Sequence, residues 1–225
     1  MFEEAIAPVA GSGHAIEGSM LALKAIALVW RGRWEEARTV AQRGWHNAQR
    51  VNSAFNFVNC SCIDAYAAWE ITRSYKHIES MRSMVDWTEA QHLELFASNW
   101  YGWCAHALQS HGDVEPAREY VKRALRRAAE GDPMGEAVAY RVLARLEPTA
   151  GDAVSMYVEK ATRAGEARGS RHEAVKTDLL RAELCRESGD EAGARRWAEA
   201  GRAGAEQLEM PWHLERALQV LSGAG

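Results

Sequence analysis

Apolar residues recur along this chain with the period of an α-helix, and short polar breaks separate the apolar stretches. Tyr101, Ala105 and Leu108, for example, fall on one helical face at positions i, i+4 and i+7. The five prolines are too few to interrupt many helices. The pattern predicts eleven helices, at residues 14–31, 34–51, 53–71, 75–92, 94–110, 114–130, 134–146, 152–168, 171–187, 190–208 and 211–222.

A repeat with a period of about 39 residues runs through this helical pattern. Four segments begin with glycine and carry a small or apolar residue five positions later, and a fifth has arginine in the glycine slot. The anchors are Gly32, Arg73, Gly112, Gly151 and Gly189, with spacings of 41, 39, 39 and 38 residues. Glycine ends a helix at low cost because it adopts the left-handed conformation. Each anchor therefore predicts the turn of a helical hairpin, and we expect the hairpins to stack because none can bury its apolar face alone.

An aspartate directly follows three of the glycine anchors. Asp113, Asp152 and Asp190 stand where a carboxylate caps the next helix or complements its dipole. They predict that a new helix starts directly after each turn.

With these anchors in place, the chain resembles the tetratricopeptide repeat superfamily. The family's small and large apolar positions fall on matching residues, which are Ala25, Ala105, Ala144 and Ala182 in first helices, Ala37, Ala117 and Ala194 in second helices, and Leu21 and Tyr101. The second repeat departs from the family with Arg73 and Ile78, and the spacing exceeds the family's usual period of about 34 residues. The resemblance implies an all-α superhelix, a solenoid of about five helical hairpins plus a C-terminal capping helix, as one domain over residues 1–225.

A narrower resemblance covers about the last 75 residues. The segments that begin at Ala161, Ser188 and Met210 resemble the C-terminal repeat regions of large bacterial signalling proteins. In those proteins similar repeats follow a cyclase domain and a STAND-type ATPase, or precede a LuxR-type DNA-binding domain as in maltose-type regulators. The resemblance implies a sensor or scaffold portion of a longer regulatory protein.

Composition and charge narrow the function classes. The net charge is −4, and the densest basic stretch, residues 122–127, is short and interleaved with apolar residues. We interpret it as a solvated helix face rather than a nucleic-acid patch. No apolar run approaches the roughly 18 residues of a membrane span, and the N-terminus lacks the basic region of a secretion signal. Four cysteines are too few for a disulfide framework, so we expect reduced thiols in a cytoplasmic protein.

The chemistry-bearing residues do not form a catalytic or metal-binding pattern. Cys60 and Cys62 lie two positions apart, so on a helix their thiols point in nearly opposite directions and cannot share one ion. Cys104 and His106 have the same spacing, and no nucleophile turn is present. We therefore expect no catalytic residue, no metal and no cofactor, and a protein that is not an enzyme.

The predicted binding surface is the concave side of the stacked hairpins, which their first helices would line. It would be apolar and aromatic in its N-terminal half and charged in its C-terminal half. The candidate groove residues are Trp30, Asn56, Asn59, Ile63, Glu70, Asn99, His106, Gln109, Lys176 and Arg186. Two questions stay open. The tryptophans, including Trp30, Trp69, Trp100 and Trp103, either fill gaps between helices or form a stacking surface. The asparagines either clamp a peptide backbone, or cap helices, or occupy solvated positions.

The leading expectation is a protein–protein interaction scaffold that binds a peptide or partner in this groove. The runner-up is a repeat domain that senses a small-molecule signal, which requires a pocket with a few convergent polar groups. A third hypothesis is self-association as a homodimer, in which residues 1–9 form either an exposed cap or the dimer contact. We expect neither a nucleic acid nor a membrane as partner.

Overall fold

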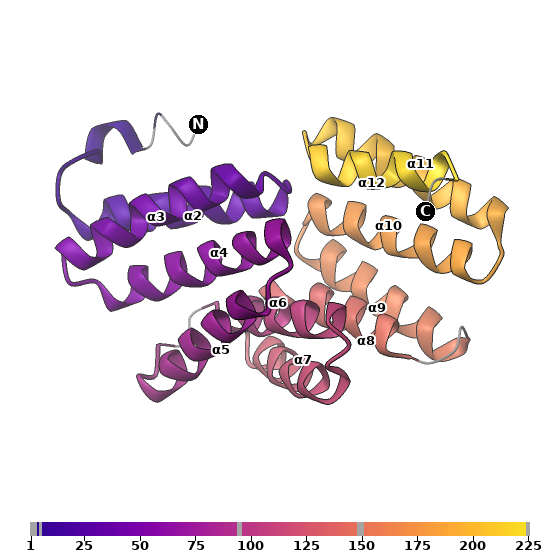
Figure 1. The fold of residues 1–225 in the computed structure, drawn as a ribbon, viewed down its shortest axis with the longest axis horizontal. Coiled ribbons are helices and arrows are strands. Elements are labelled where there is room, and N and C mark those ends of the chain that lie inside the picture. The colour runs from indigo at the N-terminus through magenta and orange to yellow at the C-terminus, as the bar shows by residue number, and fades with distance from the viewer. Residues whose placement is uncertain (1–3, 5, 94–95, 148–150, 224–225) are drawn as a thin grey trace. The chain divides into compact units, whose positions relative to one another are not determined.

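The computed structural model describes residues 4, 6–93, 96–147 and 151–223, and within these ranges all regular structure is helical. The described part contains eleven α-helices and two short 3-10 helices (Figure 1). The elements are η1 (Ala7–Val9), α2 (Ala15–Trp30), α3 (Trp34–Arg50), α4 (Ala54–Thr72), α5 (Tyr75–Ala90), α6 (Ala97–Ser110), α7 (Val114–Ala129), η2 (Pro133–Gly135), α8 (Glu136–Leu146), α9 (Asp152–Ala167), α10 (Arg171–Glu187), α11 (Glu191–Gln207) and α12 (Pro211–Leu221). The all-α prediction is confirmed, and each predicted helix boundary lies within three residues of the observed one.

The chain divides into two compact units, residues 1–95 and 96–225. In the first unit α2, α3, α4 and α5 pack each against the next, and α2 also packs against α4. In the second unit each helix from α6 to α12 packs against the next. Alternate helices α6, α8, α10 and α12 also contact one another in that order. Of the N-terminal segment predicted as a cap or dimer contact, residues 1–3 and 5 lie outside the described residues.

The turns between helices share one backbone geometry. In eight of the described turns an amide donates to the carbonyl five residues earlier, as Arg33 N does to Leu28 O at 3.0 Å. The residue before that donor adopts a left-handed conformation, with φ of 72° at Gly32 and 80° at Gly189. The predicted left-handed φ is thus confirmed at the anchors Gly32, Gly112 and Gly189. Arg73, which occupies the glycine slot of the second repeat, adopts it too, with φ of 53°.

The prediction that a glycine anchor ends a helix in the left-handed conformation is wrong at one position. Gly151 is extended, with φ of 172° and ψ of −163°, and it stands directly before α9 as its N-cap rather than closing α8. Pro148 follows α8, where a proline is expected to end the helix, but it lies outside the described residues. The prediction that an aspartate after the turn caps the next helix is confirmed at Asp190, whose Oδ1 accepts from Gly193 N at 2.8 Å. Asp113 makes no such capping bond, and Asp152 is the first residue of α9.

The small positions of the repeat pattern are buried in the helix packing. The alanines at the small positions of the repeat are all at most 2% exposed, namely Ala25, Ala37, Ala105, Ala117, Ala144, Ala182 and Ala194. A small side chain lets two helix backbones approach closely, so these positions fix the distance between neighbouring helices.

A buried polar cluster joins α2, α3 and α4 in the first unit. The Glu17 carboxylate accepts from Asn47 Nδ2 at 3.0 Å, and Asn56 Nδ2 donates to Ala15 O at 2.7 Å. A Cβ on Gly18 would lie 2.8 Å from the amides of both Asn47 and Asn56, so glycine is required for this close packing. The buried donors Asn47 Nδ2 and Asn56 Nδ2 are both paired, and they favour this helix arrangement because another would separate them from their acceptors.

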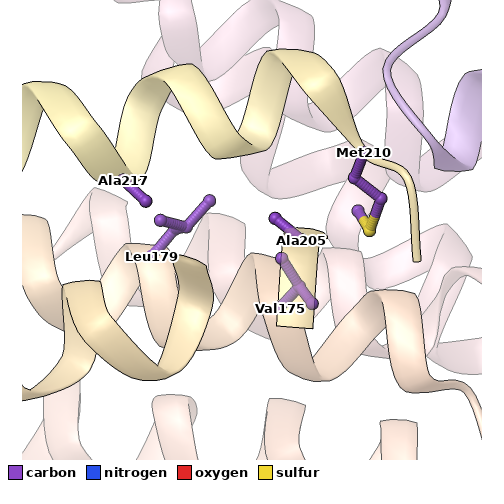
Figure 2. Packing of buried hydrophobic residues seen from close by; sticks show 5 residues of the cluster. All are labelled: Val175, Leu179, Ala205, Met210 and Ala217. Carbon is purple, nitrogen blue, oxygen red and sulfur yellow. The ribbon is translucent and has the colours of Figure 1, made fainter. Parts of the chain in front are cut away.

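The core at the C-terminal end of the second unit is apolar. Figure 2 shows Val175 and Leu179 of α10 facing Ala205 of α11, Met210 in the following turn and Ala217 of α12. All five are at most 3% exposed. This cluster anchors α12 to the two helices before it.

Candidate functional site

The predicted groove residues on α4 are buried. Asn56, Asn59, Ile63 and Glu70 are at most 6% exposed. The Asn56 amide bonds to Ala15 O, as described above, and Asn59 Nδ2 donates to the carbonyl of Phe55, on its own helix, at 2.8 Å. Both asparagine side chains thus bind the protein's own backbone, and neither caps a helix.

Glu70 belongs to a local cluster at the end of α4. It accepts from Tyr66 Oη at 3.0 Å and pairs with Arg73 at 2.5 Å. Trp30 of α2 is half-buried, whereas Trp69 is fully buried. The groove predicted for the first unit is therefore occupied by the protein's own packing at α4.

In the second unit the predicted groove residues are more accessible. Asn99 is 2% exposed, but His106, Gln109, Lys176 and Arg186 are half-buried. The tryptophans behind them, Trp100 and Trp103, are buried with their ring centres 5.1 Å apart. Three of the four tryptophans considered for a stacking surface thus fill gaps between helices.

An open cleft of about 690 Å³ lies elsewhere in the first unit, with α4 between walls from α3 and α5. None of the predicted groove residues lines it. The lining side chains are Gln42, Trp45, His46, Phe57, Cys60, Ser61, Asp64, Ala65, Lys76, His77, Glu79, Ser80, Ser83 and Met84. The cleft thus combines apolar and polar side chains from three helices, which is the composition of ligand and peptide sites.

Aromatic and sulfur-containing side chains line one part of the cleft. The rings of Trp45 on α3 and Phe57 on α4 lie 5.7 Å apart at an interplanar angle of 37°. Met84 of α5 and Cys60 of α4 also line it, and burial raises the pKa of the Cys60 thiol to about 12. The thiol is therefore protonated near neutral pH, and this part of the cleft is an uncharged apolar surface.

Charged and hydrogen-bonding groups line another part. Asp64 of α4 accepts from Arg38 Nε and from Gln42 Nε2, both at 3.1 Å. Lys76 and His77 line the cleft from α5. Burial, and next the Lys76 ammonium, lower the pKa of His77, so the imidazole is neutral near pH 7 and can donate or accept.

A ladder of ion pairs crosses α8, α10 and α12 in the second unit. Arg141 pairs with Glu173 at 2.5 Å, and Glu173 also pairs with Lys176 at 3.8 Å. Glu183 accepts from both Arg145 and Arg216. Of the two charged residues predicted for the C-terminal half of the surface, Lys176 pairs with Glu173, and the ladder as a whole binds α10 to α8 and α12.

Two buried titratable groups lie within this ladder. Burial by itself raises the pKa of Glu173, but the Arg141 guanidinium and the Lys176 ammonium hold it well below its usual range. His213 of α12 is 3% exposed, and burial, followed by the nearby cations Lys176 and Arg216, holds its pKa well below the ordinary value. At neutral pH the site therefore contains an ionised carboxylate and an uncharged imidazole.

Sequence reasoning missed the cleft because it assigned the binding surface to first helices alone. Trp45 and His46 lie on α3, which is the second helix of its hairpin. The feature of the sequence that could have indicated the cleft is the aromatic Trp45 close to the polar Gln42 and His46, on an otherwise charged face of that helix. Among the described residues no cluster of three histidine, cysteine, aspartate or glutamate side chains could hold a metal ion. In the same residues no helix is both long and apolar enough to span a bilayer.

Comparison with models of known protein families finds no match to this sequence, and a search of curated proteins finds no similar sequence.

Proposed function

We propose that the chain is a tetratricopeptide-like helical repeat module that binds a segment of a partner protein. Three features support the repeat architecture: the shared turn geometry, the buried alanines at the small positions, and the contacts between alternate helices in each unit. A repeated hairpin that buries its apolar face only by stacking is the physical basis of such arrays.

The observation that carries the binding proposal is the cleft formed by α3, α4 and α5. Its apolar part, with Trp45 and Phe57, suits an aromatic or aliphatic anchor side chain, since such anchors supply most of the binding energy at protein interfaces. Its polar part, with Asp64 and Lys76, suits a hydrogen-bonding or charged neighbour. We infer that a short partner segment with an apolar anchor next to a polar residue occupies the cleft. The surrounding bacterial regulatory protein implied by the resemblance remains part of this proposal.

A peptide selection tests this proposal. A phage-displayed peptide library is selected against the full chain, and enriched peptides are titrated by fluorescence anisotropy. Ser61→Arg places a long charged side chain in the cleft, so we expect affinity to fall by about tenfold or more. Ser110→Arg, at the exposed end of α6, is the matched control and should leave affinity unchanged. The proposal fails if no peptide is enriched or if selected peptides bind Ser61→Arg as tightly as the wild type.

The cleft volume supports a second candidate, the sensing of a small molecule. A volume of about 690 Å³ lies within the range of small-molecule sites, roughly 300–1,000 Å³. Thermal-shift screening with metabolites distinguishes the two, because a ligand at 100 times its Kd adds about 2.7 kcal/mol to the stability of the fold. A stabilising metabolite that loses its effect in Ser61→Arg would favour sensing.

A further inference from the structure

An apolar stripe runs along one face of α2. Its members recur at i, i+4, i+7, i+11 and i+14, and they are Ile16, Met20, Leu23, Ala27 and Trp30. None is charged, Ile16 is 46% exposed and Leu23 is 43% exposed. We refer to these five residues as the α2 stripe. A continuous uncharged face of this length is unusual for a helix that borders water.

The positions equivalent to the α2 stripe on other helices show whether the same face is exposed or buried there. Counted back from the turn glycines Gly32 and Gly189, Leu23 of α2 corresponds to Leu180 of α10, and Ile16 corresponds to Glu173. Leu180 is 6% exposed and Glu173 is 3% exposed. The face that is open on α2 is therefore covered on α10.

The helix before α10, α9, covers much of this face, and α8 contributes Ala144 next to Leu180 and Arg141 next to Glu173. Leu180 packs in a buried cluster with Val154 and Val158 of α9. Gly165 of α9 approaches so closely that a Cβ on it would lie 3.2 Å from Glu173 Cβ. The preceding helix thus uses small and apolar residues to reach this face.

The same arrangement recurs in the first unit on α4. Phe57 and Asp64 occupy the positions of Ile16 and Leu23, counted back from Arg73. Phe57 contacts Trp45 of α3, and Asp64 pairs with Arg38 of α3 at 3.1 Å. In two hairpins, therefore, this face of the first helix receives the second helix of the hairpin before it.

We propose that the α2 stripe binds an amphipathic helix of a partner protein, in the position that α9 holds on α10. The described residues before α2 include η1 and the helical residues Glu4 and Ile6, and they leave Ile16 and Leu23 of the stripe exposed while its other three members are half-buried. The stacking interface within each unit thus continues onto the exposed side chains of Ile16 and Leu23. This inference rests on the repeat register of the proposed function, but it concerns a different face of the molecule from the cleft.

The chemistry of the partner helix follows from α9. Its covering face carries buried residues at i, i+4, i+7 and i+11, which are Val154, Val158, Ala161 and Gly165. Because the α2 stripe presents large side chains, a close approach requires small ones opposite. A second copy of α2 offers Leu23 and Trp30 instead, so a heterologous helix with a valine, alanine and glycine stripe fits better.

A peptide titration with the full chain tests the proposal. The probe is a fluorescein-labelled peptide of residues 152–167, the sequence of α9, and binding is followed by anisotropy. Leu23→Glu should weaken binding by about tenfold or more, because a carboxylate would be buried without a partner. Leu218→Glu is the matched control, since Leu218 of α12 is 49% exposed, and it should change affinity less than about twofold. Circular dichroism verifies that each variant keeps its helix content.

The outcomes separate this proposal from the cleft. Binding that is lost in Leu23→Glu and kept in Ser61→Arg supports the α2 stripe. The proposal is overturned if the peptide shows no saturable binding, if it binds Leu23→Glu like the wild type, or if Ser61→Arg alone abolishes binding. A concentration-dependent dimer that disappears in Leu23→Glu, measured by light scattering, would also overturn it by assigning the stripe to a second copy.

Discussion

The burial of His213 makes the stability of the fold depend on pH in a defined direction. Its pKa is lowered well below 6.5 by burial first and then by Lys176, Arg216 and Arg141, against a smaller opposite effect of Glu173. In the unfolded chain the imidazole titrates at its ordinary value near 6.5. The folded state therefore stays neutral while the unfolded state takes up a proton as the pH falls.

The size of the effect follows from proton linkage. A depressed folded pKa gives stability that is complete above pH 6.5 and is lost below it, by about 1.4 kcal/mol for each pH unit. At pH 5.0 the loss from His213 alone is about 2 kcal/mol. That is a large part of a typical stability of about 5–15 kcal/mol. The carboxylate of Glu173 acts in the same direction but only at lower pH, below its ordinary pKa of about 4.5.

The assay is urea unfolding followed by circular dichroism at pH 7.5 and pH 5.0. His213→Gln removes the titrating group, so its loss of stability between these two pH values should be about 2 kcal/mol smaller than that of the wild type. His46→Gln, which replaces an exposed histidine of α3, is the control for the loss of one histidine elsewhere in the chain. The reasoning about His213 is refuted if His213→Gln and the wild type lose the same stability on acidification.

Three further substitutions test the packing by the same urea assay at pH 7.5. Glu209→Gly should raise the free energy of unfolding by about 0.5–1 kcal/mol, because Glu209 has φ of 52° and glycine adopts this conformation without strain; an unchanged value would contradict this. Asn56→Ala should lower it by about 1–3 kcal/mol, since Ala15 O loses its buried donor, and a loss below about 0.5 kcal/mol would show that the bond is dispensable. Gly135→Ala should cost about 3 kcal/mol or more, because the new Cβ would lie 1.8 Å from Ser98 O, and a wild-type transition would refute that close approach.

The helices were predictable because three local signals agreed. Apolar period, turn glycines and following acids all depend on the nearest few residues, so they survive without tertiary information. Arg73 shows where such signals stop: no sequence rule favours arginine at φ of 53°, yet the helices on either side impose it. Gly151 shows the reverse, since a glycine in the expected slot serves as an extended N-cap. The position of a turn was therefore easier to predict than its conformation.

The binding surface was harder to predict because exposure depends on which helix covers which face. Asn56 and Asn59 look like ligand contacts in the sequence, since an amide offers both a donor and an acceptor, but a helix ladder can use the same groups for its own backbone. Conversely, Leu23 and Leu180 occupy equivalent positions with the same side chain, and the packing of α8 and α9 against Leu180 makes one core and the other surface. Identical residues at equivalent helix positions thus acquire different roles from their neighbours, and exposed faces are found by comparing equivalent positions between helices. By that comparison, the α3–α4–α5 cleft and the α2 stripe are variants of a single interface, where a first helix meets the second helix before it.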